Sequence, residues 1–216
     1  MANTHRIDDS AVQWRDAEGG REGSHLLLML HGVGSNEHDL IGLAPYLPTQ
    51  LTVASLPGPL PWPNGGRSWF DVTPDHSTDT SKISASVAGI LDWLDARPEG
   101  FESVGVLGFS QGAATALQLV RTDIDRFAYV VALSGFVYNG GGENDAALAA
   151  RGLPGFVAFG TADQVITAEK TRATLDWAPD HLDLELHDYP MGHTIIEPEL
   201  EDVVAFLQRQ LARTRA

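Results

Sequence analysis

Apolar residues gather in six short runs along the chain, at residues 26–31, 52–56, 103–109, 129–133, 156–159 and 182–187. Several of these runs are apolar at nearly every position, which is typical of strands covered on both faces of a sheet. We expect residues 11–14 to add an antiparallel strand at an edge. The pattern therefore predicts a mostly parallel sheet that is buried between layers of helices.

Longer stretches with helical spacing separate these runs. Residues 81–96 place Ile83, Val87, Ile90, Leu91 and Leu94 on one face of a helix. Similar patterns predict helices at residues 113–120, 167–177 and 198–212. The alternation of strands and helices indicates an α/β fold with helices on both faces of the sheet. Residues 57–66 hold four prolines and three glycines, so we expect irregular backbone there, and we expect a mobile loop at 138–144.

Composition narrows the class of protein. The 216 residues fit a single domain spanning 1–216, of which the first ten residues could be disordered. No apolar run reaches the roughly 20 residues of a membrane helix, and no signal-peptide pattern is present, so we expect a cytoplasmic protein without a membrane span. The formal charge of −15 disfavours nucleic acid as a partner. The absence of cysteine excludes disulfides, thiolate metal sites and a cysteine nucleophile.

The sharpest motif is a serine between two glycines, Gly108-Phe109-Ser110-Gln111-Gly112. It matches G-x-S-x-G, lies directly after a predicted strand and precedes a predicted helix. Glycines relieve the crowding of such a sharp turn, and the helix N-terminus favours negative charge beside the serine. A glycine-rich turn without chemistry is the structural alternative. The strand and helix around the motif favour a nucleophilic serine.

A nucleophilic serine needs a base, and the base needs an acid to orient it. Asp163 follows the run at 156–159, and His193 follows the run at 182–187 in a turn that also contains Gly192. Both come after the serine, in the order Ser, acid, His of α/β hydrolases. His181 and His187 are the rivals for the base, but they look like strand members or strand ends. Asp188 is the rival for the acid, but it lies on the same connection as His193. We expect Asp176, Asp180 and Asp183 to be surface charges.

The loop after the first long strand, which reads LHGVGS at 30–35, is a candidate for binding the substrate oxyanion. We expect the backbone N–H groups of Val33 and Gln111 to stabilise the charge that develops on the carbonyl oxygen. Trp69 and Phe70 either line an acyl pocket or anchor an irregular loop. His31, His38 and Asp39 offer a weak metal cluster with no supporting ligand spacing, so no metal is expected.

Taken together, the motifs resemble the phospholipase/carboxylesterase family of α/β hydrolases. They are LHGVGS (30–35), WFD (69–71), GFSQG (108–112), LSGF (133–136), GTADQV (160–165) and YPMGH (189–193). The resemblance runs from about residue 26 to the last predicted helix. It departs from the family at Val33, where many members have leucine, and after Val165, where members often have proline.

The resemblance implies an α/β-hydrolase fold and a compact enzyme that needs no cofactor. It implies hydrolysis of short-to-medium acyl esters, lysophospholipids or acyl thioesters by a triad of Ser110, Asp163 and His193, with Val33 and Gln111 at the oxyanion. A small-molecule ester is then the expected partner, and the enzyme could be a homodimer. The alternatives are a dienelactone-type hydrolase, which commonly uses cysteine, and an inactive α/β hydrolase that only binds a ligand or partner.

Overall fold

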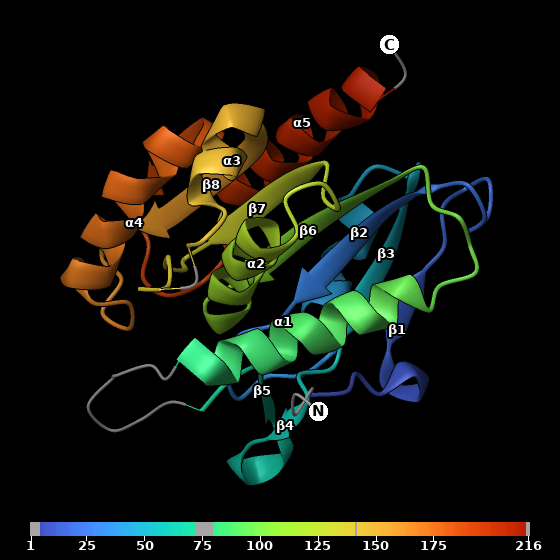
Figure 1. The fold of residues 1–216 in the computed structure, drawn as a ribbon, viewed down its shortest axis with the longest axis horizontal. Helices are drawn as coiled ribbons and strands as arrows, with labels where there is room; N and C mark the ends of the chain where they lie inside the picture. The colour runs from blue at the N-terminus through green and yellow to red at the C-terminus, as the bar shows by residue number, and fades with distance from the viewer. Residues whose placement is uncertain (1–4, 72–79, 141, 215–216) are drawn as a thin grey trace.

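A seven-stranded sheet forms the centre of the protein, in the order β1-β3-β2-β6-β7-β8-β9 (Figure 1). The computed structural model describes residues 5–71, 80–140 and 142–214. The strands are β1 (Gln13–Arg15), β2 (His25–Leu30), β3 (Leu51–Leu56), β6 (Ser103–Phe109), β7 (Tyr129–Leu133), β8 (Leu153–Gly160) and β9 (Leu182–Tyr189). Among the described strands of this sheet, only the pairing of β1 with β3 is antiparallel. The carboxyl ends of the six parallel strands therefore share one edge.

Helices cover both faces of this sheet, so each face has its own apolar core (Figure 1). On one face lie α1 (Thr80–Asp95), α2 (Gln111–Thr122), α3 (Asp145–Arg151) and α4 (Ala168–His181). On the other face lie α5 (Glu197–Thr214) and the 3₁₀ helix η2 (Leu40–Tyr46). Every residue of β2, β3 and β7 is buried. This two-sided burial explains why these strands are not alternating in sequence.

The six apolar runs and the predicted edge strand are all present as strands, and the four predicted helices as α1, α2, α4 and α5. The prediction of irregular backbone at 57–66 is wrong in part. Strand β4 (Leu60–Pro61) pairs with β5 (Arg67–Ser68) around the 3₁₀ helix η3 (Pro63–Gly65). Proline is tolerated in such a hairpin because a strand with a free edge does not need every N–H. Helix α3 was not predicted, since seven residues carry little periodic signal.

The first ten residues and the loop at 138–144 are the segments for which the sequence predicts disorder or mobility. Where the structure describes them, both make specific contacts. The His5 N–H donates to the Ala85 carbonyl on α1, and residues 9–11 form a 3₁₀ turn, whereas residues 1–4 lie outside the described chain. The loop after β7 is held by Arg121, which is 4% exposed. Its guanidinium donates two bonds to Asp145, at 2.8 and 2.9 Å, and others to the carbonyls of Tyr138 and Gly140.

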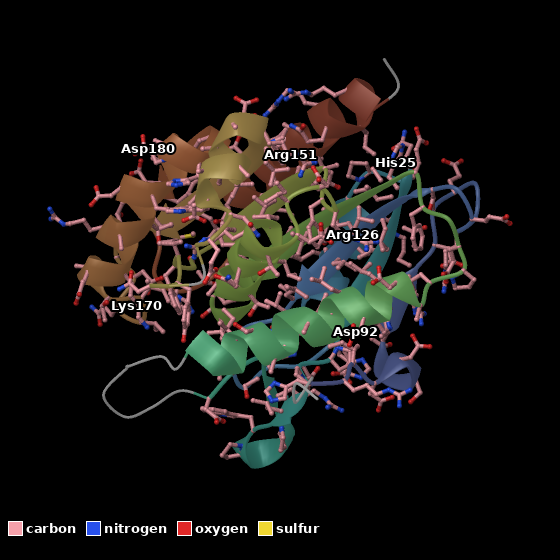
Figure 2. All side chains as sticks on the ribbon, viewed as in Figure 1. His25, Asp92, Arg126, Arg151, Lys170 and Asp180 are labelled. Atoms are coloured by element: carbon pink, nitrogen blue, oxygen red, sulfur yellow. The ribbon has the colours of Figure 1, made fainter. Side chains whose placement is uncertain are left out.

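The acidic charge of the chain lies mainly at its surface. Asp92 on α1 and Asp180 on α4 are exposed, and Figure 2 labels both, with Asp180 at the upper left edge of the molecule. Asp176 and Asp183 are exposed as well, as expected. Asp183 and Glu185 on β9 pair with Arg213 and Arg209 on α5. Among the helices that the structure describes, none combines the length and apolar character needed to cross a bilayer.

Two described carboxyl groups, those of Glu37 and Glu199, depart from this surface pattern. Glu199, in the first turn of α5, is fully buried, on the same helix face as Val203 and Phe206. Neither of its oxygens has a hydrogen-bond partner within the described residues. Burial raises the pKa of Glu199 to about 7, because the charged form loses its hydration. The folded protein therefore retains a proton on this group that an unfolded chain releases near the ordinary pKa of 4.5.

Glu199→Gln should raise stability at alkaline pH. Because its pKa is raised in the folded state, the contribution of Glu199 to stability is fully present below about pH 4.5. This contribution is lost as the pH rises through about 7. At pH 8.5 the variant should gain up to about 3 kcal/mol over the native chain, and most of this gain should vanish at pH 5. Urea unfolding at the two pH values measures both numbers. Glu201→Gln, an exposed site on the same helix, is the control and should show no such dependence on pH.

Candidate active site

Ser110 occupies a sharp turn between β6 and α2, at the carboxyl edge of the sheet. Its backbone has φ 56° and ψ −117°, which is an unfavourable conformation for a residue with a Cβ. A Cβ on Gly108 would collide with the Gly112 carbonyl, and a Cβ on Gly112 with the Leu30 carbonyl. Both glycines of the motif are therefore required by close backbone packing. Ser134, which follows the adjacent strand β7, is the other described non-glycine residue with a positive φ.

The structure brings Ser110, His193 and Asp163 into one hydrogen-bonded line. His193 Nε2 lies 2.9 Å from Ser110 Oγ, and His193 Nδ1 lies 2.7 Å from Asp163 Oδ2. Asp163 follows β8 and His193 follows β9, so both reach the same edge of the sheet as the serine. The Thr161 N–H donates to the Tyr189 carbonyl, and the Ala162 N–H to the Met191 carbonyl. These bonds hold the two loops together.

The hydrogen bonds of Asp163 determine which form of the imidazole faces the serine. Burial opposes ionisation of this carboxyl, but bonds from His193 and from the N–H groups of Ile166 and Val165 outweigh it and lower its pKa. The N–H groups of Val165 and Ile166 reach Asp163 Oδ1 at 2.8 and 3.1 Å. An ionised carboxylate only accepts, so the imidazole proton resides on Nδ1. His193 Nε2 is then free to accept the Ser110 proton.

The rival residues lie in other environments. His181 stacks on Trp177, and its Nδ1 contacts the Trp177 carbonyl at 2.6 Å. His187 stacks on Phe156 and faces α5. Asp188 is an exposed residue of β9. None of the three is hydrogen-bonded to Ser110 or His193 in the described structure.

The loop after β2 passes beside Ser110. The pairing of β2 with β6 ends at Leu30 and Gly108, so residues 31–35 run next to the turn that holds the serine. A Cβ on Gly32 would lie 3.4 Å from the Cβ of Ser110. Among the described hydrogen bonds, none is donated by the backbone N–H of Val33 or of Gln111.

His31 is a structural residue of this loop, which the sequence did not reveal. It is 0% exposed, its Nδ1–H donates to the Gly32 carbonyl at 2.8 Å, and its Nε2 accepts the Gly58 N–H at 3.0 Å. Burial lowers the pKa of His31 and keeps the ring neutral. Because both ring nitrogens are engaged, His31 cannot join His38 and Asp39 as a metal ligand. Over the described residues, no group of three or more His, Asp or Glu side chains could hold a metal ion.

Trp69 and Phe70 belong to the apolar core beneath the site. Trp69 is 0% exposed and Phe70 is 3% exposed. The Trp69 ring packs against His31, and the Phe70 ring contacts Tyr138 edge-on. These contacts favour the second of the two sequence interpretations, in which the aromatic pair anchors an irregular segment.

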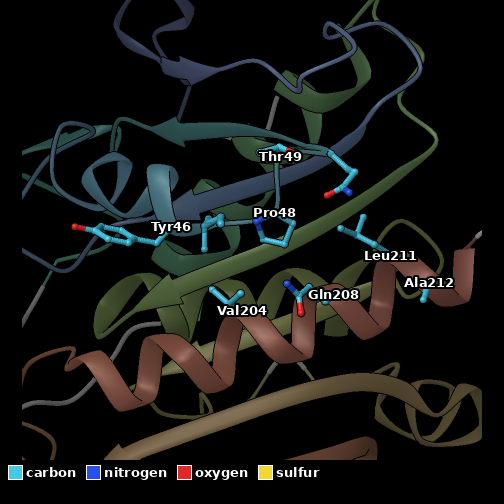
Figure 3. Close-up of a pocket in the computed structure, with 9 residues that line it drawn as sticks. Tyr46, Pro48, Thr49, Val204, Gln208, Leu211 and Ala212 are labelled. Carbon is cyan, nitrogen blue, oxygen red and sulfur yellow. The ribbon is translucent and has the colours of Figure 1, made fainter.

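A pocket of about 510 Å³ lies elsewhere, between α5 and the segment that joins η2 to β3 (Figure 3). It is lined by residues 46–50 and by Val204, Gln208, Leu211 and Ala212. Gln50 precedes the first residue of β3, so the pocket extends toward the amino end of that strand. Its lining has no carboxylate, imidazole or amine, and therefore no base for acyl transfer.

Comparison with known proteins identifies the family. Residues 17–211 match the model of the phospholipase/carboxylesterase family. An acyl-protein thioesterase 1 from Mycosarcoma maydis is 30% identical, with 95% of this chain and 88% of that protein covered. The fold matches a carboxylesterase from Mesorhizobium loti with a TM-score of 0.79 at 23% identity, covering 95% and 99% of the two chains. It also matches acyl-protein thioesterase 2 from Zea mays, with a TM-score of 0.74 at 23% identity and coverage of 93% and 98%. The chain belongs to the phospholipase/carboxylesterase family of α/β hydrolases.

Proposed function

We propose that this protein is a serine hydrolase that cleaves short-to-medium acyl esters or acyl thioesters through an acyl-enzyme. The observation that carries the proposal is the line of hydrogen bonds from Ser110 through His193 to Asp163. The family match supports ester or thioester chemistry. A relative that is 30% identical is named as an acyl-protein thioesterase, so acyl thioesters are a substrate class to test.

In the first half of the reaction, Ser110 Oγ attacks the acyl carbonyl carbon and His193 Nε2 takes the hydroxyl proton. The Asp163 carboxylate holds the ring and stabilises the imidazolium without taking the proton itself. The carbonyl oxygen becomes an oxyanion, which accepts bonds from the N–H groups of Val33 and Gln111. When the intermediate collapses, the bond to the alcohol or thiol breaks, and the imidazolium protonates the leaving group.

In the second half, His193 takes a proton from water, and the resulting hydroxide attacks the acyl-enzyme. The bond between the acyl carbon and Ser110 Oγ then breaks, and the serine recovers its proton from the imidazolium. The same two backbone amides stabilise the second oxyanion. The catalytic groups of this cycle are side chains and backbone amides of this chain, and the reactants are the ester or thioester and water.

Ser110→Ala should abolish turnover while the fold is preserved. Removal of the nucleophile should lower kcat for p-nitrophenyl butyrate by at least about 10³-fold, with circular dichroism unchanged. A fluorophosphonate probe should label the native protein at Ser110, as mass spectrometry of the tryptic peptide would show. Absence of labelling, with no turnover of any ester, would instead support a binding protein. Full activity of the alanine variant would overturn the assignment of the nucleophile.

Asp163→Asn should lower kcat by about 10⁴-fold, because an amide that donates to Nδ1 stabilises the wrong tautomer of His193. Asp188→Asn is the matched control at the rival position and should stay within about twofold of the native rate.

The pH–rate profile of the native protein should fall on the acid side, because a protonated base cannot accept the Ser110 proton. Asp163 should not cause this fall, since its pKa lies below the usual range. A rate that is flat from pH 5 to 9 would exclude His193 as the base.

Rates on p-nitrophenyl esters of increasing acyl length, with one acyl thioester of matched chain length, would define the substrate class. We expect kcat/KM to peak within the short-to-medium esters and the thioester to be hydrolysed as well. A steady rise to the longest chains would contradict the preference for short-to-medium acyl groups. A thioester rate no higher than that of Ser110→Ala would restrict the enzyme to oxygen esters.

A further inference from the structure

The side chain of Gln111 connects two parts of the site that are distant in sequence. Its amide is 3% exposed and lies in the first turn of α2, beside Ser110. Gln111 Oε1 accepts the Trp69 N–H at 2.8 Å, and Gln111 Nε2 donates to the Phe70 carbonyl at 2.7 Å. Both ends of the amide thus bond to the backbone of one short segment, 41 and 42 residues earlier in the chain.

That segment also contacts the loop that carries Val33, on both sides of this residue. The Gly34 N–H donates to the Arg67 carbonyl at 2.9 Å, and the Arg67 N–H donates to the Ser35 carbonyl at 2.7 Å. On the other side, the Trp69 indole N–H donates to the His31 carbonyl at 2.8 Å. We refer to residues 67–70 with these bonds as the bridging segment.

The sheet alone does not fix the distance between Val33 and Gln111. The pairing of β2 with β6 ends at Leu30 and Gly108, three residues before each of the two amides. Beyond that point, described hydrogen bonds join the two loops through the bridging segment. Gly66 lies so close to Gly34 that a Cβ on Gly66 would collide with the Gly34 carbonyl. The segment and the loop that carries Val33 therefore have little room to move relative to each other.

We propose that the Gln111 side chain is a positioning residue for the oxyanion site. Through the bridging segment, it sets the spacing between the Val33 and Gln111 backbone N–H groups. The inference rests on the proposed function, in which these two amides bind the oxyanion. Gln111 then contributes twice, through its N–H to the reacting oxygen and through its side chain to the placement of the other donor.

This role makes a specific prediction for Gln111→Met, which preserves size and removes both side-chain bonds. A displacement of about 1 Å between catalytic groups can cost about 10²-fold in rate. We therefore expect kcat to fall by about 10- to 100-fold, with KM within about threefold of the native value. A trifluoromethyl ketone that forms a tetrahedral adduct with Ser110 should bind more weakly by a similar factor, because it requires the same donors as the transition state.

Two further variants separate positioning from simple stabilisation of the fold. Gln111→Glu keeps an acceptor for the Trp69 N–H but places a carboxylate against the Phe70 carbonyl, so it should also lose kcat. Trp69→Phe keeps the backbone bond to Gln111 but removes the indole bond to His31 and part of a buried ring. Its effect on kcat should be less than additive with that of Gln111→Met. Gln208→Met, an exposed site on α5, is the control for the substitution itself.

A lower melting temperature for Gln111→Met, with kcat and ketone affinity unchanged, would overturn the proposal and leave Gln111 a purely structural residue. If the methionine variant does not fold, Gln111→Glu and Trp69→Phe provide the same comparison. The outcome is separate from that of the proposed function. Failure of Ser110→Ala to abolish turnover removes the enzyme mechanism itself, whereas failure here removes only the role of the Gln111 side chain.

Discussion

The close backbone contact between α2 and the carboxyl ends of β2 and β6 is the constraint on which the site depends. Gly112 lies against the Leu30 carbonyl, and Gly108 lies against the Gly112 carbonyl, at distances that exclude any side chain. The contact brings the N-terminus of α2 to the end of the sheet and forces Ser110 into its unfavourable backbone conformation. The abrupt start of the helix places Ser110, which is 5% exposed, at the carboxyl edge of the sheet. The parallel sheet in turn provides the rigid frame that sustains this strain.

Asp163 and His193 are held both by local bonds and by contacts with other loops. Asp163 accepts two backbone N–H groups from its own turn, and its loop bonds to the loop of His193. His193 is oriented by Asp163 at one nitrogen and packs against the ring of Phe109, which precedes the serine. Three loops from different strands therefore converge, and hydrogen bonds between residues far apart in the sequence join them. This convergence is a consequence of parallel strands that end at a common edge.

The sequence was sufficient for the sheet, the main helices and the candidate Ser-His-Asp residues, because each leaves a local signal. Fully apolar runs indicate buried strands, and Gly108, Ser110 and Gly112 report a strand-to-helix turn. The hairpin of β4 and β5 was not predicted, since its proline-rich residues carry little strand signal and its second strand bonds to a loop distant in sequence, at Gly34 and Ser35. For the same reason the roles of His31 and the Gln111 side chain were missed. Their partners lie 27 and about 40 residues away, and no periodicity encodes such contacts.

The buried polar side chains near the site have a common physical role that apolar side chains cannot take. His31 and Gln111 are fully buried, yet each uses its side chain to bond backbone groups of the irregular segment between β3 and α1. Gly58, Trp69 and Phe70 lie outside the pairing of β4 with β5, so buried side chains supply partners for their backbone groups. Those bonds connect the segment to the loop after β2 and to the first turn of α2. Irregular backbone can therefore be held in place beside the site. The polar side chains that bond to its N–H and carbonyl groups extend from the loop after β2 and from the first turn of α2.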